Sequence, residues 1–311
     1  MIGFLLLLAS AVLLTGGSEL FAEHAAAAGR RFGVTALAVG LVLAGAEPEE
    51  MITALISSAR HLPGIAAGDA IGANVTMLTF VLGLAALARP IQLSRRVRAY
   101  ALAGSGAGLL AAIALAGGSV GALWGACLVA VYAGIVAVVW WRERRPPAFG
   151  EAAELEEDHD KPDLVARDSR AAVMVIIGVA GMAFGGWLAV SGAERIVNSL
   201  GLRQSVVGLT FVALATTAEL FALVWAAYRR GIEELALAGV LGSTIYNATA
   251  TLGFAAIVHP LRVHGLQGQA WLAAALPVAL VLYAALFKRV GRVGGVLLVA
   301  GYGAYLGLTF T

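Results

Sequence analysis

Two glutamates, Glu49 and Glu219, each lie within a long apolar stretch of the chain. A charged side chain at the centre of a membrane helix costs about 2.5–3.5 kcal/mol even on a lenient scale, so an acid there usually has a function. Thr216 precedes Glu219 by three residues on the same helical face, and Ser243 and Asn247 are four residues apart. Carboxylate, hydroxyl and carbonyl oxygens are the ligands that Ca²⁺ and Na⁺ prefer. These residue types therefore predict a binding site for a hard metal cation.

If the two carboxylates met at one centre, a proton and a metal cation would compete to bind there. Acids removed from water together repel each other, so a site without a metal ion is expected to hold a proton. An arriving cation displaces this proton, and two competing positive occupants of one site are the physical requirement for antiport. The alternative for the glutamates is a structural buried acid, and an interhelical hydrogen bond explains Thr79, Thr244 and Thr249 equally well. No cluster of His or Cys favours a softer metal, because Cys127 is the single cysteine.

The elements that must position these residues are two copies of one unit, residues 38–91 and 208–261. Adding 170 to the numbers of the first copy brings its special residues into register with the second without a gap. The matched pairs are Glu49 with Glu219, Arg60 with Arg230, Gly72 with Gly242, Thr79 with Thr249, and Pro90 with Pro260. Apolar residues match by chance in so hydrophobic a chain, but a shared register of acid, glycine and proline indicates a duplication.

The composition places both copies in a membrane. Of the 311 residues 60% are hydrophobic and 13% are charged, and the mean hydropathy is +0.87. About 20 apolar residues span a bilayer as a helix. Ten such spans are predicted, at 2–29, 34–59, 69–88, 99–116, 119–141, 171–198, 205–228, 236–258, 268–287 and 293–310. The first is interpreted as a retained helix and not as a signal peptide, because no basic segment precedes its apolar core.

The basic residues predict how these spans are oriented. Of the 21 Lys and Arg, 17 fall on one face of the expected topology, so that face is cytoplasmic and both termini lie outside. Each half, 1–141 and 171–311, contains five spans, so the second half enters the membrane from the opposite side and the duplication is an inverted repeat. Residues 142–170 join the halves as a cytoplasmic linker. Its acidic run, 151–160, is interpreted as solvated, with a regulatory cation site as the less favoured alternative.

The polar residues of the two copies resemble the motifs of the sodium/calcium exchanger superfamily, in its prokaryotic form. The family has a Gly-Thr-Ser-x-Pro-Glu type of motif in the second helix of each half and Gly-Asn-x-x-Gly-Ser-Asn-x-x-Asn/Asp in the third. The corresponding stretches of this chain are Gly45-Ala46-Glu47-Pro48-Glu49, Gly68-Asp69-Ala70-Ile71-Gly72-Ala73-Asn74, Ala215-Thr216-Thr217-Ala218-Glu219 and Ala238-Gly239-Val240-Leu241-Gly242-Ser243. The first helix of each half is similar too, at Gly17-Ser18-Glu19 and Ser191-Gly192-Ala193-Glu194.

The resemblance implies an all-α membrane protein whose ten transmembrane helices form two inverted five-helix repeats. It also implies that Glu49 and Glu219 are the calcium-binding pair. The sodium or proton-coupling ligands that it implies are Thr216, Ser243 and Asn247. The other motif positions that it places in the cation-binding set are Asp69, Asn74, Gly45 and Ala215.

Several residues depart from the family's pattern. The first copy lacks the usual polar side chains at Gly45, Ala46, Ala73 and Met77. The second copy has Asn247 where sodium-coupled members often have an acid, and it lacks the motif proline. Fewer side-chain oxygens put a three-sodium stoichiometry in doubt.

The first copy also contains three acids without acidic counterparts in the second, Glu47, Glu50 and Asp69. Asp69 takes the position of the family's first Asn, where it either titrates or gates the site, or caps a helix next to Gly68. Glu50 points about 100° away from Glu49 on an ideal helix, so it is the weaker candidate for the site.

These observations together predict a secondary antiporter that exchanges Ca²⁺ for Na⁺ or H⁺ by alternating access and needs no cofactor. The alternative is an exchanger-fold relative with a degraded site, which acts as a non-coupled cation pathway or on a different cation. An enzyme is not expected, because the sequence has neither a nucleophile–base spacing nor a nucleotide-binding loop. The expected partners are the lipid bilayer of the cell membrane and small inorganic cations. The net charge of +2 gives no reason to expect nucleic acid, and no feature requires a protein partner.

Overall fold

The structure is a computed structural model that describes residues 1–31, 47–143, 170–230, 233–263 and 265–311. In this part of the chain nine helices are long and apolar enough to cross a membrane. The one expected span not among these nine, 34–59, begins outside the described residues and continues within them as α3 (Pro48–Ala59). The long helices expose large apolar side chains such as Trp141 and Leu286, at 72% and 78% of their surface, as contact with lipid requires.

Prolines determine several helix boundaries in the first half. Its elements are α1 (Ile2–Arg31), α3, α4 (Pro63–Thr76), the π-helical segment η1 (Met77–Val81), α5 (Leu82–Ala88), α6 (Arg95–Ala116), the short strand β1 (Ser119–Val120) and α7 (Ala122–Glu143). Pro48 and Pro63 open α3 and α4, where the missing N–H would have no helical partner anyway. Pro63 therefore starts the third span six residues before the expected 69. Pro90 follows α5, and the residue before it is extended, which ends the helix.

The second half repeats this order of elements. It consists of α9 (Ala171–Leu200), α10 (Gln204–Val207), the π-helical segment η2 (Gly208–Val212), α11 (Ala213–Thr216), α12 (Ala218–Arg230), α13 (Glu233–Tyr246), the π-helical segment η3 (Asn247–Thr251), α14 (Leu252–Val258), the strand β2 (Leu261–Arg262), α15 (Gln267–Phe287) and α16 (Arg292–Phe310). The offset of 170 between the copies holds for whole elements, because α4, η1 and α5 correspond to α13, η3 and α14 residue for residue.

The span expected at 205–228 is not one continuous helix. It ends at Thr216 and starts again at Ala218, because Thr217 between them leaves helical geometry with a ψ of 4°. The Thr217 hydroxyl donates to the carbonyl oxygen of Ala213 at 2.7 Å, a side-chain contact that competes with the regular backbone ladder. The matching place in the first half is also a helix start, because α3 begins at Pro48. Both copies therefore begin a helix at equivalent positions, Pro48 and Ala218.

The inverted relationship of the halves is visible in two short backbone pairings. Val120 of β1 pairs with Leu261 of β2, and Ile91 pairs with Val290. Ile91 and Leu261 differ by 170 in number, as do Val120 and Val290. The same contact is therefore made twice with the halves exchanged, which is the behaviour expected of a two-fold related pair.

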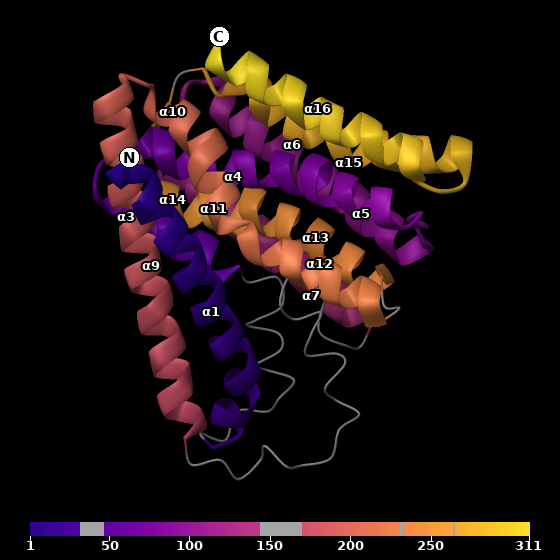
Figure 1. Ribbon diagram of the computed structural model, residues 1–311, viewed down its shortest axis with the longest axis horizontal. Helices are drawn as coiled ribbons and strands as arrows, with labels where there is room; N and C mark the ends of the chain where they lie inside the picture. Colours follow the sequence, from indigo (N-terminus) through magenta and orange to yellow (C-terminus); the bar gives the residue numbers. More distant parts are fainter. Residues whose placement is uncertain (32–46, 144–169, 231–232, 264) are drawn as a thin grey trace.

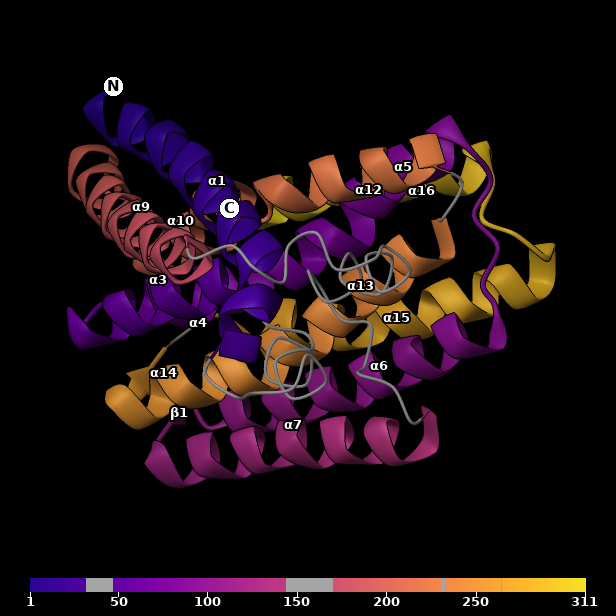
Figure 2. The same cartoon turned by 90° about the horizontal axis from the view of Figure 1, so that it is seen from below.

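Close glycine contacts hold the helices that flank the repeats. α1 and α9 lie side by side at one edge of the bundle and run in opposite directions (Figure 1, Figure 2). A Cβ atom on Gly17 would come within 2.8 Å of the Gly178 carbonyl oxygen, so only glycine permits this approach. Likewise, a Cβ atom on Gly72 of α4 would collide with the Leu209 carbonyl oxygen of η2. These contacts allow the second half to pack closely against the first, next to the polar residues.

Candidate cation-binding site

The structure brings three glutamates together between the halves. One carboxylate oxygen each of Glu47, Glu49 and Glu219 lies within 4.8 Å of the other two. Glu47 and Glu49 are fully buried, and Glu219 is partly buried. Glu49 and Glu219 are the second residues of α3 and α12, where the free N–H groups of a helix start favour negative charge. The two repeat-related acids thus converge as expected, and Glu47 joins them.

Side chains from two further helices orient these acids. The Ser18 hydroxyl of α1 donates to Oε2 of Glu49 at 3.0 Å, and the Ser243 hydroxyl of α13 donates to Oε1 of Glu47. Ser18 and Ser243 are both fully buried. The three-glutamate site is therefore enclosed by α1, α3, α12 and α13, which come from both halves of the chain.

Asp69 lies close to the three-glutamate site, in the middle of a helix and not at its cap. It is the seventh residue of α4 and is fully buried, so the solvated N-cap alternative is wrong. The Thr216 hydroxyl donates to Oδ1 of Asp69 at 3.0 Å, across the contact between the two halves. A mid-helix position next to Gly68 and Gly72 brings the carboxylate against η2 and α11, where its exposure is 0%.

Glu50 was expected to be the weaker candidate for the site, but its side chain is buried inside the protein. Its side chain is 1% exposed, interacts electrostatically with Glu47 and Asp69, and faces the side chain of Asn247. Asn247 is the first residue of η3 and accepts a hydrogen bond from the Thr251 hydroxyl at 3.2 Å. The direction away from Glu49 thus leads to a second polar group and not to lipid.

The remaining predicted ligands are Asn74, Ala215 and Gly45. Asn74 donates from Nδ2 to the Thr244 carbonyl oxygen at 3.0 Å and so joins α4 to α13. Ala215 is buried at the end of α11, and Gly45 lies outside the described residues.

The hydroxyls of Thr79, Thr244 and Thr249 were expected either to bind the cation or to form hydrogen bonds between helices, and the structure places their hydrogen bonds within helices instead. The hydroxyls of Thr79, Thr244 and Thr249 donate to carbonyl oxygens three or four residues earlier in their own helices, at 2.5, 2.7 and 2.5 Å. Such back-bonding satisfies a hydroxyl locally.

Two residues of the site were missed as ligands or supports, Glu47 and Ser18. Glu47 and Glu49 are two positions apart, which puts them on different faces of a continuous helix. In the structure Glu47 precedes the helix start at Pro48, so this constraint does not apply to it. Pro48 itself was the available signal, because proline favours the first turn of a helix.

The fold and the site together are those of a membrane transporter built from inverted repeats. Its two halves repeat each other in inverted orientation, long apolar helices enclose it, and buried carboxylates meet where the halves join. Broken helices whose starts face a central ion site are a recurring design of membrane transporters. The oxygen-only donor set suits a hard cation such as Ca²⁺ or Na⁺.

Comparison with known proteins identifies the family. The family described as sodium/calcium exchanger protein matches residues 2–141 and 170–311, and the chain belongs to it. An uncharacterized membrane protein of Methanocaldococcus jannaschii, MJ0091, is 30% identical over 92% of this chain and 88% of its own length. The inner membrane protein YrbG of Escherichia coli is 26% identical over 98% of both chains. A solved structure of the sodium–calcium exchanger NCX_Mj superposes with a TM-score of 0.65 and 25% identity over 99% of both chains. The all-α membrane fold with two repeats is thereby confirmed.

Proposed function

We propose that this protein is a secondary antiporter that moves Ca²⁺ in exchange for Na⁺ or H⁺ by alternating access. The observation that supports it is the meeting of Glu47, Glu49 and Glu219 within 4.8 Å at the junction of the halves. The names of relatives agree with this activity, since the family and the structural neighbour NCX_Mj are described as sodium/calcium exchangers.

Charge balance explains why such a site needs a cation. Within the described part of the chain, the buried polar side chains include no Lys or Arg. Several charged carboxylates buried close together repel one another, and the two helix N-termini offset only part of the charge. A divalent cation bound by oxygen ligands neutralises the group and occupies the space on which the acids converge.

The other predicted ligands support this centre in different ways in our proposal. Ser243 positions Glu47, and Thr216 positions Asp69 beside the centre. Asn247 and Asp69 belong to the neighbouring group around Glu50. Of the remaining motif positions, Ala215 contributes surrounding backbone and Asn74 links α4 to α13, while Gly45 lies outside the described residues.

The orientation in the membrane is also part of the proposal. The positive-inside distribution places residues 142–170 in the cytoplasm and both termini outside, in the cell membrane. The linker then lies on the side opposite Arg60.

Calcium flux into proteoliposomes tests the activity directly. Purified protein is reconstituted, and uptake of radiolabelled Ca²⁺ is measured with a sodium gradient and a pH gradient imposed separately. We expect uptake driven by one of the gradients and its loss in Glu49→Gln and in Glu219→Gln. Glu23→Gln, an exposed acid on α1, is the matched control that retains flux.

Two outcomes contradict the exchanger. Uptake that ignores both gradients indicates a non-coupled cation pathway, the alternative expected from the missing hydroxyls of the first copy. Unchanged flux in both glutamine variants shows that the buried acids do not bind the transported ion.

A further inference from the structure

Two histidines from opposite halves of the chain lie side by side in the structure. The ring centroids of His61 and His259 are 4.4 Å apart, and the rings meet edge to face at 84°. His61 is exposed and His259 is half-buried, so the pair is open at the surface. The two residues follow the ends of α3 and α14, on the side that the basic residues predict to be outside the cell. Because they lie far apart in the sequence, no motif predicted their pairing.

The backbone at His61 has a conformation that usually requires glycine. Its φ is 59°, in the left-handed region. The Leu62 N–H donates to the Ser57 carbonyl oxygen at 2.9 Å, and the His61 N–H donates to that of Ser58 at 3.0 Å, which are the two bonds of a Schellman helix end. The related position of the second copy is Gly231, the residue type most common at such an end. A side chain kept in this unfavourable conformation is a candidate for function, because such residues concentrate at functional sites.

The surroundings of the pair favour a positive ion. Both histidines lie at a helix C-terminus, where the free carbonyl groups carry partial negative charge. The neighbouring cation, Arg60, is paired with Glu194 at 2.7 Å, so its charge is offset. The buried Ser58 hydroxyl donates to the carbonyl oxygens of Ala255 at 2.6 Å and of His259 at 3.4 Å. The backbones that carry the two rings are therefore joined without an ion.

We propose that His61 and His259 form a surface site for a divalent transition-metal ion of the zinc class, which links the two halves of the chain. Imidazole nitrogen is a preferred ligand of Zn²⁺, Cu²⁺ and Ni²⁺, whereas Ca²⁺ takes oxygen ligands. Zinc binds imidazole nitrogen at about 2.0–2.1 Å, so two rings this close can share one ion, with water in its other positions. Arg89 is the position related to His259, as Gly231 is to His61, so the repeat does not duplicate the pair. The site is separate from the three-glutamate site and does not depend on the proposed exchange.

Zinc binding to the purified full-length protein tests the site. The protein carries no polyhistidine tag, and binding of radiolabelled Zn²⁺ is measured with excess Ca²⁺ present to fill oxygen sites for hard cations. We expect one Zn²⁺ per chain, with an affinity at least about tenfold lower in His61→Gly and in His259→Gln, since loss of even an outer partner of a metal ligand costs this much. His24→Gln is the matched control. This half-buried histidine of α1 contacts the Leu20 carbonyl oxygen at 3.0 Å, and its loss should leave zinc binding unchanged.

Melting temperature and spectroscopy separate metal binding from packing. Glycine accepts the left-handed backbone, so His61→Gly should keep its metal-free melting temperature within about 4 °C of the natural value. Zn²⁺ should raise the melting temperature of the natural protein and of His24→Gln, but not that of His61→Gly. With Cu²⁺ in place of Zn²⁺, the electron paramagnetic resonance signal should be split by two nitrogen nuclei in the natural protein and by fewer in His259→Gln.

Three results would overturn the site. Equal zinc affinity in the natural protein and both variants, or no zinc binding in any of them, means that the two histidines hold no ion. A copper signal without nitrogen splitting excludes imidazole as the ligand. A lower melting temperature of His61→Gly, raised by zinc as much as that of the natural protein, shows that the rings make a packing contact only. The exchange proposal is decided separately, by calcium flux.

Discussion

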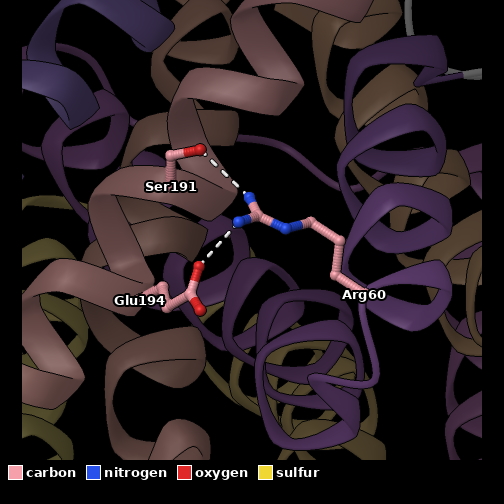
Figure 3. Close-up of polar contacts among 3 residues, drawn as sticks. All are labelled: Arg60, Ser191 and Glu194. Atoms are coloured by element: carbon pink, nitrogen blue, oxygen red, sulfur yellow. Dashed lines mark hydrogen bonds and ion pairs between the residues drawn. The ribbon is translucent and has the colours of Figure 1, made fainter.

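An ion pair between the turn after α3 and helix α9 is expected to control how often the site changes its accessible side. Nη2 of Arg60 lies 2.7 Å from Oε2 of Glu194, and Nη1 donates to the Ser191 hydroxyl at 3.0 Å (Figure 3). Alternating access requires the halves or their flanking helices to move past each other around the fixed site. We therefore expect the contact between α9 and the hairpin that carries Glu49 to form in one orientation and break in the other.

The size of the effect follows from the distance and the exposure. Two unit charges 2.7 Å apart attract by about 1.5 kcal/mol in bulk water. The side chains are 35% and 40% exposed, so salt screening and lost side-chain entropy reduce the net value to about 1 kcal/mol or less. Removing the pair should change the ratio of the two orientations by up to about fivefold.

Gradient-driven calcium flux in a double-mutant cycle measures this contribution. Arg60→Gln and Glu194→Gln should shift flux in the same direction by similar factors, and the double variant should resemble either single one, because each removes the same pair. The charge exchange Arg60→Glu/Glu194→Arg should restore most of the natural rate. Calcium affinity at equilibrium should stay within about twofold in all of them, since the pair touches no ligand. Additive single effects, or four variants with natural flux, would refute the reasoning.

A reversible cross-link checks the same motion by another route. The chain has one cysteine, Cys127, so Cys127→Ser gives a background without thiols. Arg60→Cys and Glu194→Cys, bridged by a bifunctional thiol reagent with a reducible spacer, should stop flux, and reduction should restore it. Each single cysteine with the reagent is the control. Full flux in the bridged protein would show that α9 and the hairpin do not separate during transport.

The remaining predictions concern packing and the support of the acids. Gly72→Ala should destabilise the protein by about 1–3 kcal/mol or more, because its Cβ would meet the Leu209 backbone. Gly106→Ala, with no atom within 4 Å of the added carbon, should be neutral or stabilising, and equal melting temperatures in detergent would contradict the close contact. Ser243→Ala should weaken calcium binding about five- to tenfold by leaving Oε1 of Glu47 without its donor, and Ser243→Thr should retain affinity. Unchanged calcium affinity in Ser243→Ala would show that the serine does not position Glu47.

The sequence was sufficient for the architecture because the duplicated register is a global signal. The offset of 170 aligned Glu49 with Glu219 and placed each in an apolar helix pair, and this implied that the acids meet. Apolar length predicted ten spans, of which nine lie in the described part of the chain, and the orientation inferred from the basic loops stays a prediction. These arguments depend on averages over many residues, so errors of a few residues at helix ends do not affect them.

The detail of the site could not be predicted, because it depends on where helices break. A continuous helix through Glu49 excludes Glu47 from the same centre, whereas a helix that starts at Pro48 admits it. The break at Thr217 is a change in the backbone geometry of a single residue, which no hydrophobic pattern records. The support of Glu49 by Ser18 depends on the packing of α1, a helix outside the repeated unit of residues 38–91.

The backbones of the two halves are related by symmetry, but their polar side chains differ in charge. All three acids without counterparts, Glu47, Glu50 and Asp69, belong to the first copy, and the positions related to them by 170 are Thr217, Leu220 and Gly239. Each faces a neutral polar side chain of the second copy, since Glu47 meets Ser243, Asp69 meets Thr216 and Glu50 faces Asn247. The positions related to these three partners are Ala73, Ala46 and Met77.

The missing polar residues of the first copy are therefore not a loss of ligands. One half supplies the excess of negative charge, and the other supplies the hydroxyl and amide groups that orient it. Neither half contains a complete site: Ser18 and Glu49 both belong to the first half, but the pairs Glu47–Ser243, Asp69–Thr216 and Glu50–Asn247 join one half to the other. Relative movement of the halves must then alter the carboxylates' surroundings directly, which links the binding of cations to the change of access in the proposed exchange.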